Sequence, residues 1–436
     1  MNSTTTTTTT TTTASAAMPL LKVEQSAMTT AVMDSSPDAC VSKALADSSS
    51  TPIVKTLSLQ DYLALETRTQ FLQEMRNSLT TIGTFYIKDH GVATDLTTGA
   101  MQTVRNYFSL PLEEKKKMMI GNSRHFRGYK LIGEELTNNQ VDHREQLQFA
   151  PEQAPLDSFV PTTSLDYHGL QGPNQWPATT LAAVPEFQST ILKFMDELET
   201  LSHHIMEAVA LSLGLEASYF KNLFGDNPYY RLKCAKYPSV NKAATIGCGA
   251  HKDTGFLTVL LQDMVGGLQG QDPVSGQWMD TRPIPDTFIV TMGEAIERMT
   301  GGLYHATVHR VLNNTSGQDR YSIPFFFDPS LDAKIPHRIP EVSIGGRPKT
   351  LAPTMAFSSI AGESDSESED DELEGMMDSL SIHGEAAGAG IEGEVVVAAE
   401  SIDHPMSRTW SNGEHIFETV HRCHPEVFAR WYTSEQ

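Results

Sequence analysis

Cysteine is scarce in this sequence, with four residues in 436. Cys40, Cys234, Cys248 and Cys423 form no CxxC pair, so neither a structural zinc site nor a disulfide framework is expected. This pattern fits a reducing, cytoplasmic compartment. Long apolar runs are also missing, and none of them reaches the length of a membrane span. The N-terminus has neither the basic and apolar regions of a secretory signal nor the arginines of a mitochondrial presequence. We therefore expect no contact with membranes.

Basic residues are in the minority, with 32 Lys and Arg against 54 Asp and Glu. Thirteen of the acidic residues, and no Lys or Arg, lie between residues 361 and 400. The rest of the chain carries a net charge of about −9, as in an ordinary acidic protein. Nucleic-acid binding needs basic patches that neutralise phosphates, so no nucleic-acid partner is expected.

Two segments have compositions that cannot form a packed core. Residues 1–51 contain the threonine run Thr4–Thr13 followed by Ser, Ala and Asp, and residues 359–405 contain an acidic tract followed by Gly and Ala. Such segments bury too little apolar surface to offset the entropy lost on ordering, so we predict a disordered leader and a disordered insertion. Ordered regions are then expected over 52–185, 186–358 and 406–436.

The order of predicted elements indicates an α+β fold. Hydrophobic spacing favours helices over 59–80, 94–108, 112–119, 185–214 and 412–431. Residues 83–87 read as a strand, and from about residue 229 the chain changes to short β-prone runs: Phe256–Leu261, Gly267–Gly270, Phe288–Met292 and Ser322–Phe327. Helices followed by many short strands predict an antiparallel barrel or jelly roll flanked by helices. The last helix is expected to pack on this core.

His251 and Asp253 are two residues apart, and on a strand their side chains would point to the same face. The His-x-Asp pair is a weak signal by itself. It gains weight from His309, because two imidazoles and one carboxylate form the facial triad of non-haem Fe(II) oxygenases. His305 is the competing third ligand, but only His309 lies at a suitable distance from the pair described next.

Arg320 and Ser322 follow His309 by eleven and thirteen residues. They are also two apart, so on a strand they would share a face. A guanidinium with a nearby hydroxyl can bind a carboxylate, although a structural ion pair would explain the arginine equally well.

These motifs occur in a fixed order along the chain. In the C-terminal half they are His251-x-Asp253, Leu257–Asp263, Gly267–Gln269, Trp278, Met292-Gly293, Thr300–Gly302, His309–Val311 and Arg320–Phe326. In the N-terminal half they are Gly83-x-Phe85, His90–Val92, Phe108-x-Leu110-Pro111, Glu114-Lys115, Arg127–Tyr129 and Glu134. Together they resemble the isopenicillin-N-synthase-like family of 2-oxoglutarate/Fe(II)-dependent dioxygenases, over about residues 52–358 and the final helix. The resemblance implies a double-stranded β-helix (jelly-roll) core in 186–358, with its long leading helix, behind a non-haem dioxygenase N-terminal region in 52–185.

The resemblance also implies roles for individual residues. His251, Asp253 and His309 would hold Fe(2+), with no catalytic residue beyond these ligands. Arg320, Ser322 and Tyr237 would bind 2-oxoglutarate, a co-substrate used together with O2, and ascorbate would stimulate the reaction. Two positions depart from the family pattern: Ala235 stands where Asn is usual, and Glu294 where Asp is usual.

The implied function is the oxidation of a small organic molecule by a monomeric enzyme. Hydroxylation is the default outcome, with desaturation or cyclisation as alternatives, in secondary metabolism or small-molecule catabolism. Two rival functions stay open. One is an iron oxidase of the isopenicillin N synthase type that does not use 2-oxoglutarate, and the other is a non-catalytic binding protein on the same scaffold.

Overall fold

The structure is a computed structural model that describes residues 54–138, 140–155, 167–241, 246–339 and 411–432. The predicted leader 1–51 and the predicted insertion 359–405 lie outside these residues. Within the described residues, no helix is long and apolar enough to cross a membrane.

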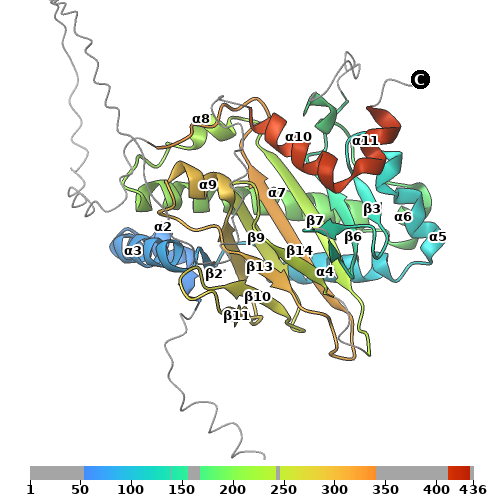
Figure 1. Cartoon of the computed structure of the whole chain (residues 1–436), viewed down its shortest axis with the longest axis horizontal. Coiled ribbons are helices and arrows are strands. Elements are labelled where there is room, and N and C mark those ends of the chain that lie inside the picture. Colours follow the sequence, from blue (N-terminus) through green and yellow to red (C-terminus); the bar gives the residue numbers. More distant parts are fainter. Residues whose placement is uncertain (1–53, 139, 156–166, 242–245, 340–410, 433–436) are drawn as a thin grey trace, which may run out of the picture. The chain divides into compact units, whose positions relative to one another are not determined.

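Two sheets form the centre of the molecule (Figure 1). The large sheet has the order β1 (Thr56–Ser58), β2 (Thr84–Lys88), β12 (Phe288–Met292), β9 (Leu257–Gln262), β14 (Arg320–Asp328), β7 (Tyr229–Tyr237), β6 (Glu145–Phe149) and β3 (Gly128–Lys130). The small sheet has the order β11 (Trp278–Asp280), β10 (Leu268–Gln271), β13 (His309–Val311) and β8 (Cys248–His251). From β7 to β14 the chain passes back and forth between the sheets, which confirms the predicted α+β jelly roll.

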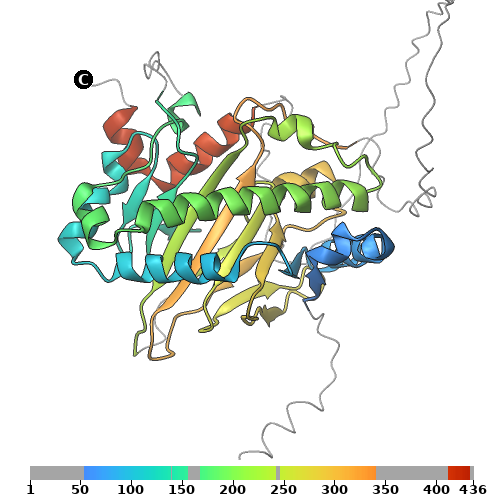
Figure 2. The same cartoon turned by 180° about the vertical axis from the view of Figure 1, so that it is seen from behind.

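Residues of the large sheet alternate between its two faces. On β14, Ile323, Phe325 and Phe327 belong to the main apolar core, whereas Ser322, Pro324 and Phe326 line a cavity on the other face. The core face is covered by α7 (Phe187–Ser212) and α4 (Thr94–Phe108), which lie across the strands in Figure 2. The cavity therefore lies on the side where the small sheet packs.

The remaining helices surround this core. They are α2 (Leu59–Leu63), α3 (Leu65–Thr81), α5 (Leu112–Lys115), α6 (Ala178–Ala183), α8 (Lys221–Phe224), α9 (Glu294–Met299), α10 (Asn412–Cys423) and α11 (Pro425–Trp431). The helix expected over 112–119 is shorter, because the chain continues as the 3-10 turn Lys116–Met118. The helical segment expected over 412–431 is divided, since Pro425 begins a new helix and cannot continue α10.

The N-terminal region shares the large sheet with the C-terminal strands. β2 pairs with β12, and β6 pairs with β7, both antiparallel. A short hairpin, β4 (Leu136–Thr137) with β5 (Gln140–Val141), lies beside β8 and brings N-terminal side chains to the small sheet. Residues from both halves of the chain can therefore reach one site between the sheets.

Candidate active site

Three of the residues expected to bind a metal converge at one end of the small sheet. His251 ends β8 and His309 begins β13, and the two are direct partners in the antiparallel register. Each Nε2 atom approaches the Oδ1 atom of Asp253, at 3.8 Å for His251 and 3.7 Å for His309. One candidate ligand atom from each residue lies within 4.8 Å of the others.

The local backbone differs from the expectation in one respect. β8 ends at His251, so Asp253 lies in the loop that follows and does not share a strand with it. The loop still turns the carboxylate toward the two imidazoles, while Lys252 points elsewhere and pairs with Glu297 at 2.6 Å. His305 also lies near Glu297 and outside the three-residue group, so the competing ligand does not converge with the others.

Neighbouring groups orient all three side chains for metal binding. The Nδ1 atoms of His251 and His309 lie 2.8 Å and 3.0 Å from the carbonyl oxygens of Gly249 and Thr307. A carbonyl only accepts, so each Nδ1 carries the proton and each Nε2 keeps its lone pair for a metal. The Thr258 hydroxyl donates to Oδ2 of Asp253 at 2.6 Å, which leaves Oδ1 facing the imidazoles. Two neutral nitrogens and one carboxylate oxygen fit Fe(II).

The electrostatics of the group favour these protonation states. Burial raises the pKa of Asp253, but the nearby His309 and His251 and the Thr258 hydrogen bond outweigh it, and the pKa is lowered on balance. Burial, together with His251, lowers the pKa of His309. An ionised carboxylate and a neutral imidazole are the forms that bind a metal.

Arg320 lies at the start of β14, in register with Tyr237 of β7. It is 1% exposed, and its guanidinium carbon lies 4.8 Å from the centre of the Tyr237 ring. Its nitrogens donate to the Ser322 hydroxyl at 3.4 Å and to Oε1 of Gln262 at 3.2 Å, while Nε is buried without a hydrogen-bond partner. Among the described residues no acidic side chain pairs with it, so the structural ion pair considered above is absent there.

The candidate metal ligands and the residues around Arg320 line one and the same cavity. It is lined by His251, Asp253 and His309 and by Arg320, Ser322 and Tyr237, and it has a volume of about 100 Å³. Apolar side chains from both sheets, among them Leu260, Leu268 and Ile289, complete its wall. The six residues singled out from the sequence thus line a single cavity between the sheets.

Several residues that shape this cavity were not expected from the sequence. On β9, Thr258 donates a hydrogen bond to Asp253, and Gln262 accepts one from Arg320. Both residues belong to the motif Leu257–Asp263, but no role was predicted for either of them. Arg144 and Lys233 also line the cavity. Their positions depend on strand register and on a loop from the N-terminal half, which residue spacing does not encode.

Comparisons with known proteins agree with this architecture. Residues 53–179 match the model "non-haem dioxygenase in morphine synthesis N-terminal", and residues 227–329 match the model of the 2OG-Fe(II) oxygenase superfamily. The chain is 34% identical over 303 residues to 1-aminocyclopropane-1-carboxylate oxidase of Dictyostelium mucoroides, covering 63% of this chain and 80% of that protein. The chain belongs to the 2OG-Fe(II) oxygenase superfamily.

Other members of this superfamily are also similar to the chain in sequence and in structure. The 2-oxoglutarate-dependent dioxygenase frbJ of a Dothideomycetidae species is 34% identical over 277 residues, covering 62% of this chain and 72% of that one. The crystal structure of Neurospora crassa T7H with α-KG and thymine superposes with a TM-score of 0.58 at 26% identity, covering 67% and 90% of the two chains. The prediction of an Fe(II)- and 2-oxoglutarate-dependent oxidoreductase that uses O2 is therefore confirmed at the level of the family.

Proposed function

We propose that His251, Asp253 and His309 hold the catalytic Fe(II), that Arg320 and Ser322 bind the distal carboxylate of 2-oxoglutarate, and that Tyr237 also contacts this co-substrate. The observation that carries this proposal is the convergence of the three ligand atoms beside a buried arginine with an unsatisfied Nε, in one cavity. When bound, Fe(II) and 2-oxoglutarate together supply the activation of O2 that oxidises a C–H bond.

The protein's own side chains then act by positioning. The Gly249 and Thr307 carbonyls fix the imidazole tautomers, and Thr258 fixes the carboxylate. Arg320 offers a planar fork of donors, and Ser322 a further hydroxyl, for one carboxylate. Burial of this clamp and the apolar cavity wall exclude water, which strengthens the ionic contact and limits side reactions.

The reaction we propose is hydroxylation of a small organic molecule, with desaturation or cyclisation as other outcomes at the same centre. Relatives and structural neighbours are named for, or bound to, small molecules that include 1-aminocyclopropane-1-carboxylate and thymine. A role in secondary metabolism or small-molecule catabolism, a cytoplasmic location, a monomeric state and stimulation by ascorbate complete the proposal.

Measurement of O2 consumption and succinate formation, with and without 2-oxoglutarate, tests this function. We expect both to depend on Fe(II) and on 2-oxoglutarate, and to be lost in Asp253→Ala. O2 consumption without 2-oxoglutarate would favour the oxidase alternative. Purified protein that binds no Fe(II) would favour the non-catalytic alternative.

A further inference from the structure

A second cationic group lines the same cavity as Arg320. Lys233 and Tyr237 are four residues apart on β7, so both side chains are on the cavity face. At the rise of a strand, their Cα atoms are about 13 Å apart. Tyr237 is paired with Arg320, and Lys233 lies further along the strand.

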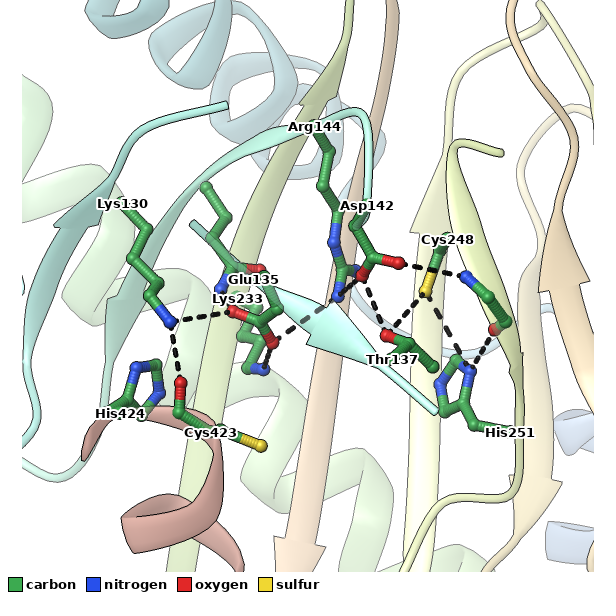
Figure 3. Close-up of polar contacts among 12 residues, drawn as sticks. Lys130, Glu135, Thr137, Asp142, Arg144, Lys233, Cys248, His251, Cys423 and His424 are labelled. Atoms are coloured by element: carbon green, nitrogen blue, oxygen red, sulfur yellow. Dashed lines mark hydrogen bonds and ion pairs between the residues drawn. The ribbon is translucent and has the colours of Figure 1, made fainter. Parts of the chain in front are cut away.

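The Arg144 side chain also lines the cavity and reaches the same cluster as Lys233 (Figure 3). Arg144 directly precedes β6, where Glu145 pairs with Lys236, so its backbone lies beside Tyr237 and its side chain extends toward the carboxylate of Glu135 that it shares with Lys233. Its Nη2 atom lies 2.9 Å from Oδ2 of Asp142 and 3.5 Å from Oε1 of Glu135. The same Oε1 atom lies 3.3 Å from Nζ of Lys233, and the other carboxylate oxygen of Glu135 lies 3.7 Å from Nζ of Lys130. The Arg144 and Lys233 side chains are 11% and 13% exposed.

Arg144 and Lys233 share their counter-charges with a third cation. Lys130, Arg144 and Lys233 surround two buried carboxylates, Glu135 and Asp142. Burial raises the pKa of Glu135, but Lys233, Arg144 and other neighbours outweigh it and lower the pKa on balance, so Glu135 is ionised. Glu426, whose side chain is 46% exposed, lies 3.9 Å from Lys130 and supplies the third carboxylate of the cluster.

Arg144 also has an unsatisfied donor. Its Nε atom is buried and has no hydrogen-bond partner. A buried donor without an acceptor is unfavourable. A carboxylate placed in the cavity would satisfy this donor, because it supplies several acceptor positions.

The Arg144 cluster is coupled to the metal side by hydrogen bonds, also drawn in Figure 3. Asp142, the partner of Arg144, accepts from the backbone N–H of Gly249 at 3.0 Å. The Gly249 carbonyl in turn accepts from Nδ1 of His251 at 2.8 Å. An anion held by Arg144 is therefore fixed relative to the proposed iron ligand through two residues.

We propose that Arg144 and Lys233 bind the carboxylate of the substrate, and that the substrate is a small organic acid. This inference rests on the proposed function, since it assigns the substrate class of the same site. Arg320 and Ser322 bind the co-substrate, and the Arg144–Lys233 pair binds the oxidised molecule beside Glu135. The two carboxylates then occupy the cavity together.

Equilibrium binding to the full chain, loaded anaerobically with Fe(II) and saturating 2-oxoglutarate, tests the inference. The probes are acetate, hexanoate and benzoate, each compared with its primary amide. Since hydrogen bonds to charged groups contribute about 1.5–3 kcal/mol, we expect the best acid to bind at least about 10-fold more tightly than its amide. Arg144→Gln and Lys233→Gln should each abolish most of this preference.

Two further variants separate this role from a structural one. Lys236→Gln is the matched control, because Lys236 is on the opposite face of β7 and pairs with Glu145 and Asp319; its preference for acids should be unchanged. Glu135→Gln should bind acids more tightly than the parent, because it removes the carboxylate that competes for both cations. Loss of folding cannot produce that gain.

The 2-oxoglutarate affinity is measured in parallel. We expect it to be unchanged in Arg144→Gln and Lys233→Gln and weakened in Arg320→Gln. A parent protein that binds neither Fe(II) nor 2-oxoglutarate would contradict the proposed function itself. The present inference is overturned if Fe(II) and 2-oxoglutarate bind normally but amides match acids, no acid binds, acids compete with 2-oxoglutarate, or Lys236→Gln loses the preference as well.

Discussion

The hydroxyl of Thr258 provides a sharp test of how the site is held in place. It donates to the carboxylate of Asp253 at 2.6 Å, and both residues are buried. Thr258→Val keeps the shape of the side chain and removes this donor. The Oδ2 atom of Asp253 then loses the side-chain hydrogen bond that fixes its rotation.

Loss of this hydrogen bond is expected to change two measured quantities, the free energy of unfolding of the apo protein and the affinity for Fe(II). A hydrogen bond to a charged group contributes about 1.5–3 kcal/mol in total. Because this bond exists without metal, part of that energy is lost from the free energy of unfolding of the apo protein. The remainder affects metal affinity through the orientation of the carboxylate, and loss of such outer contacts weakens metal binding by about 10- to 100-fold. We therefore expect the Fe(II) dissociation constant of Thr258→Val to rise by about 10-fold, at the lower end of this range.

Anaerobic competition between the apo protein and a chelator measures that constant. Thr291→Val is the matched control, because Thr291 lies directly opposite Thr258 on β12, lines the same cavity and contacts Thr84 instead of Asp253. Its Fe(II) affinity should equal that of the parent, and Thr258→Ser should restore most of the loss. Equal affinities for Thr258→Val and the parent, or an equal loss in Thr291→Val, would refute the role of Thr258.

Three other outcomes are expected. Asp253→Ala should abolish succinate formation and Fe(II) binding while the far-ultraviolet circular dichroism spectrum is unchanged; residual turnover near the parent rate would contradict the metal assignment. Arg320→Gln should raise the KM for 2-oxoglutarate by at least about 30-fold, since truncating one partner of a buried charge pair costs about 2–5 kcal/mol, whereas an unchanged KM would point to the oxidase alternative. Burial lowers the pKa of His125 and of His424 to about 4, below the ordinary value near 6.5. The unfolded chain therefore binds more protons between pH 6.5 and 4, and the free energy of unfolding should fall as pH falls through that window. Denaturant titrations at several pH values measure this slope, which His424→Gln should flatten; an identical slope in that variant would exclude the contribution of His424.

The metal ligands could be predicted because their signal is local and ordered. His251 and Asp253 are two residues apart, and His309 precedes Arg320 and Ser322 at a fixed distance. The helical spacing of apolar residues likewise predicted α7 to within two residues at each end. These features depend on neighbours along the chain, so composition and periodicity reveal them.

What could not be predicted depends on register between distant segments. Thr258 reaches Asp253 only because β9 begins where the loop after β8 turns back, and Gln262 reaches Arg320 only because β9 and β14 pair in one register. Arg144 belongs to the N-terminal half and lines the cavity only because β6 pairs with β7. The strand ends were misplaced for a similar reason, since the sequence does not show that β8 ends at His251.

Ala235 removes one polar group from the cavity face of β7. It lies between Lys233 and Tyr237, buried at 1% exposure among Tyr237, Cys248 and Val311. The family pattern usually has Asn at this position, and an amide there would offer a donor and an acceptor midway along the strand. The methyl group of Ala235 offers neither, so the polar groups at this level come from its partners in register, Ser322 on β14 and Gln146 on β6. Ser322 accepts from Arg320 and Gln146 donates to Glu135. Each of these two side chains is therefore tied to a different one of the two proposed carboxylate sites.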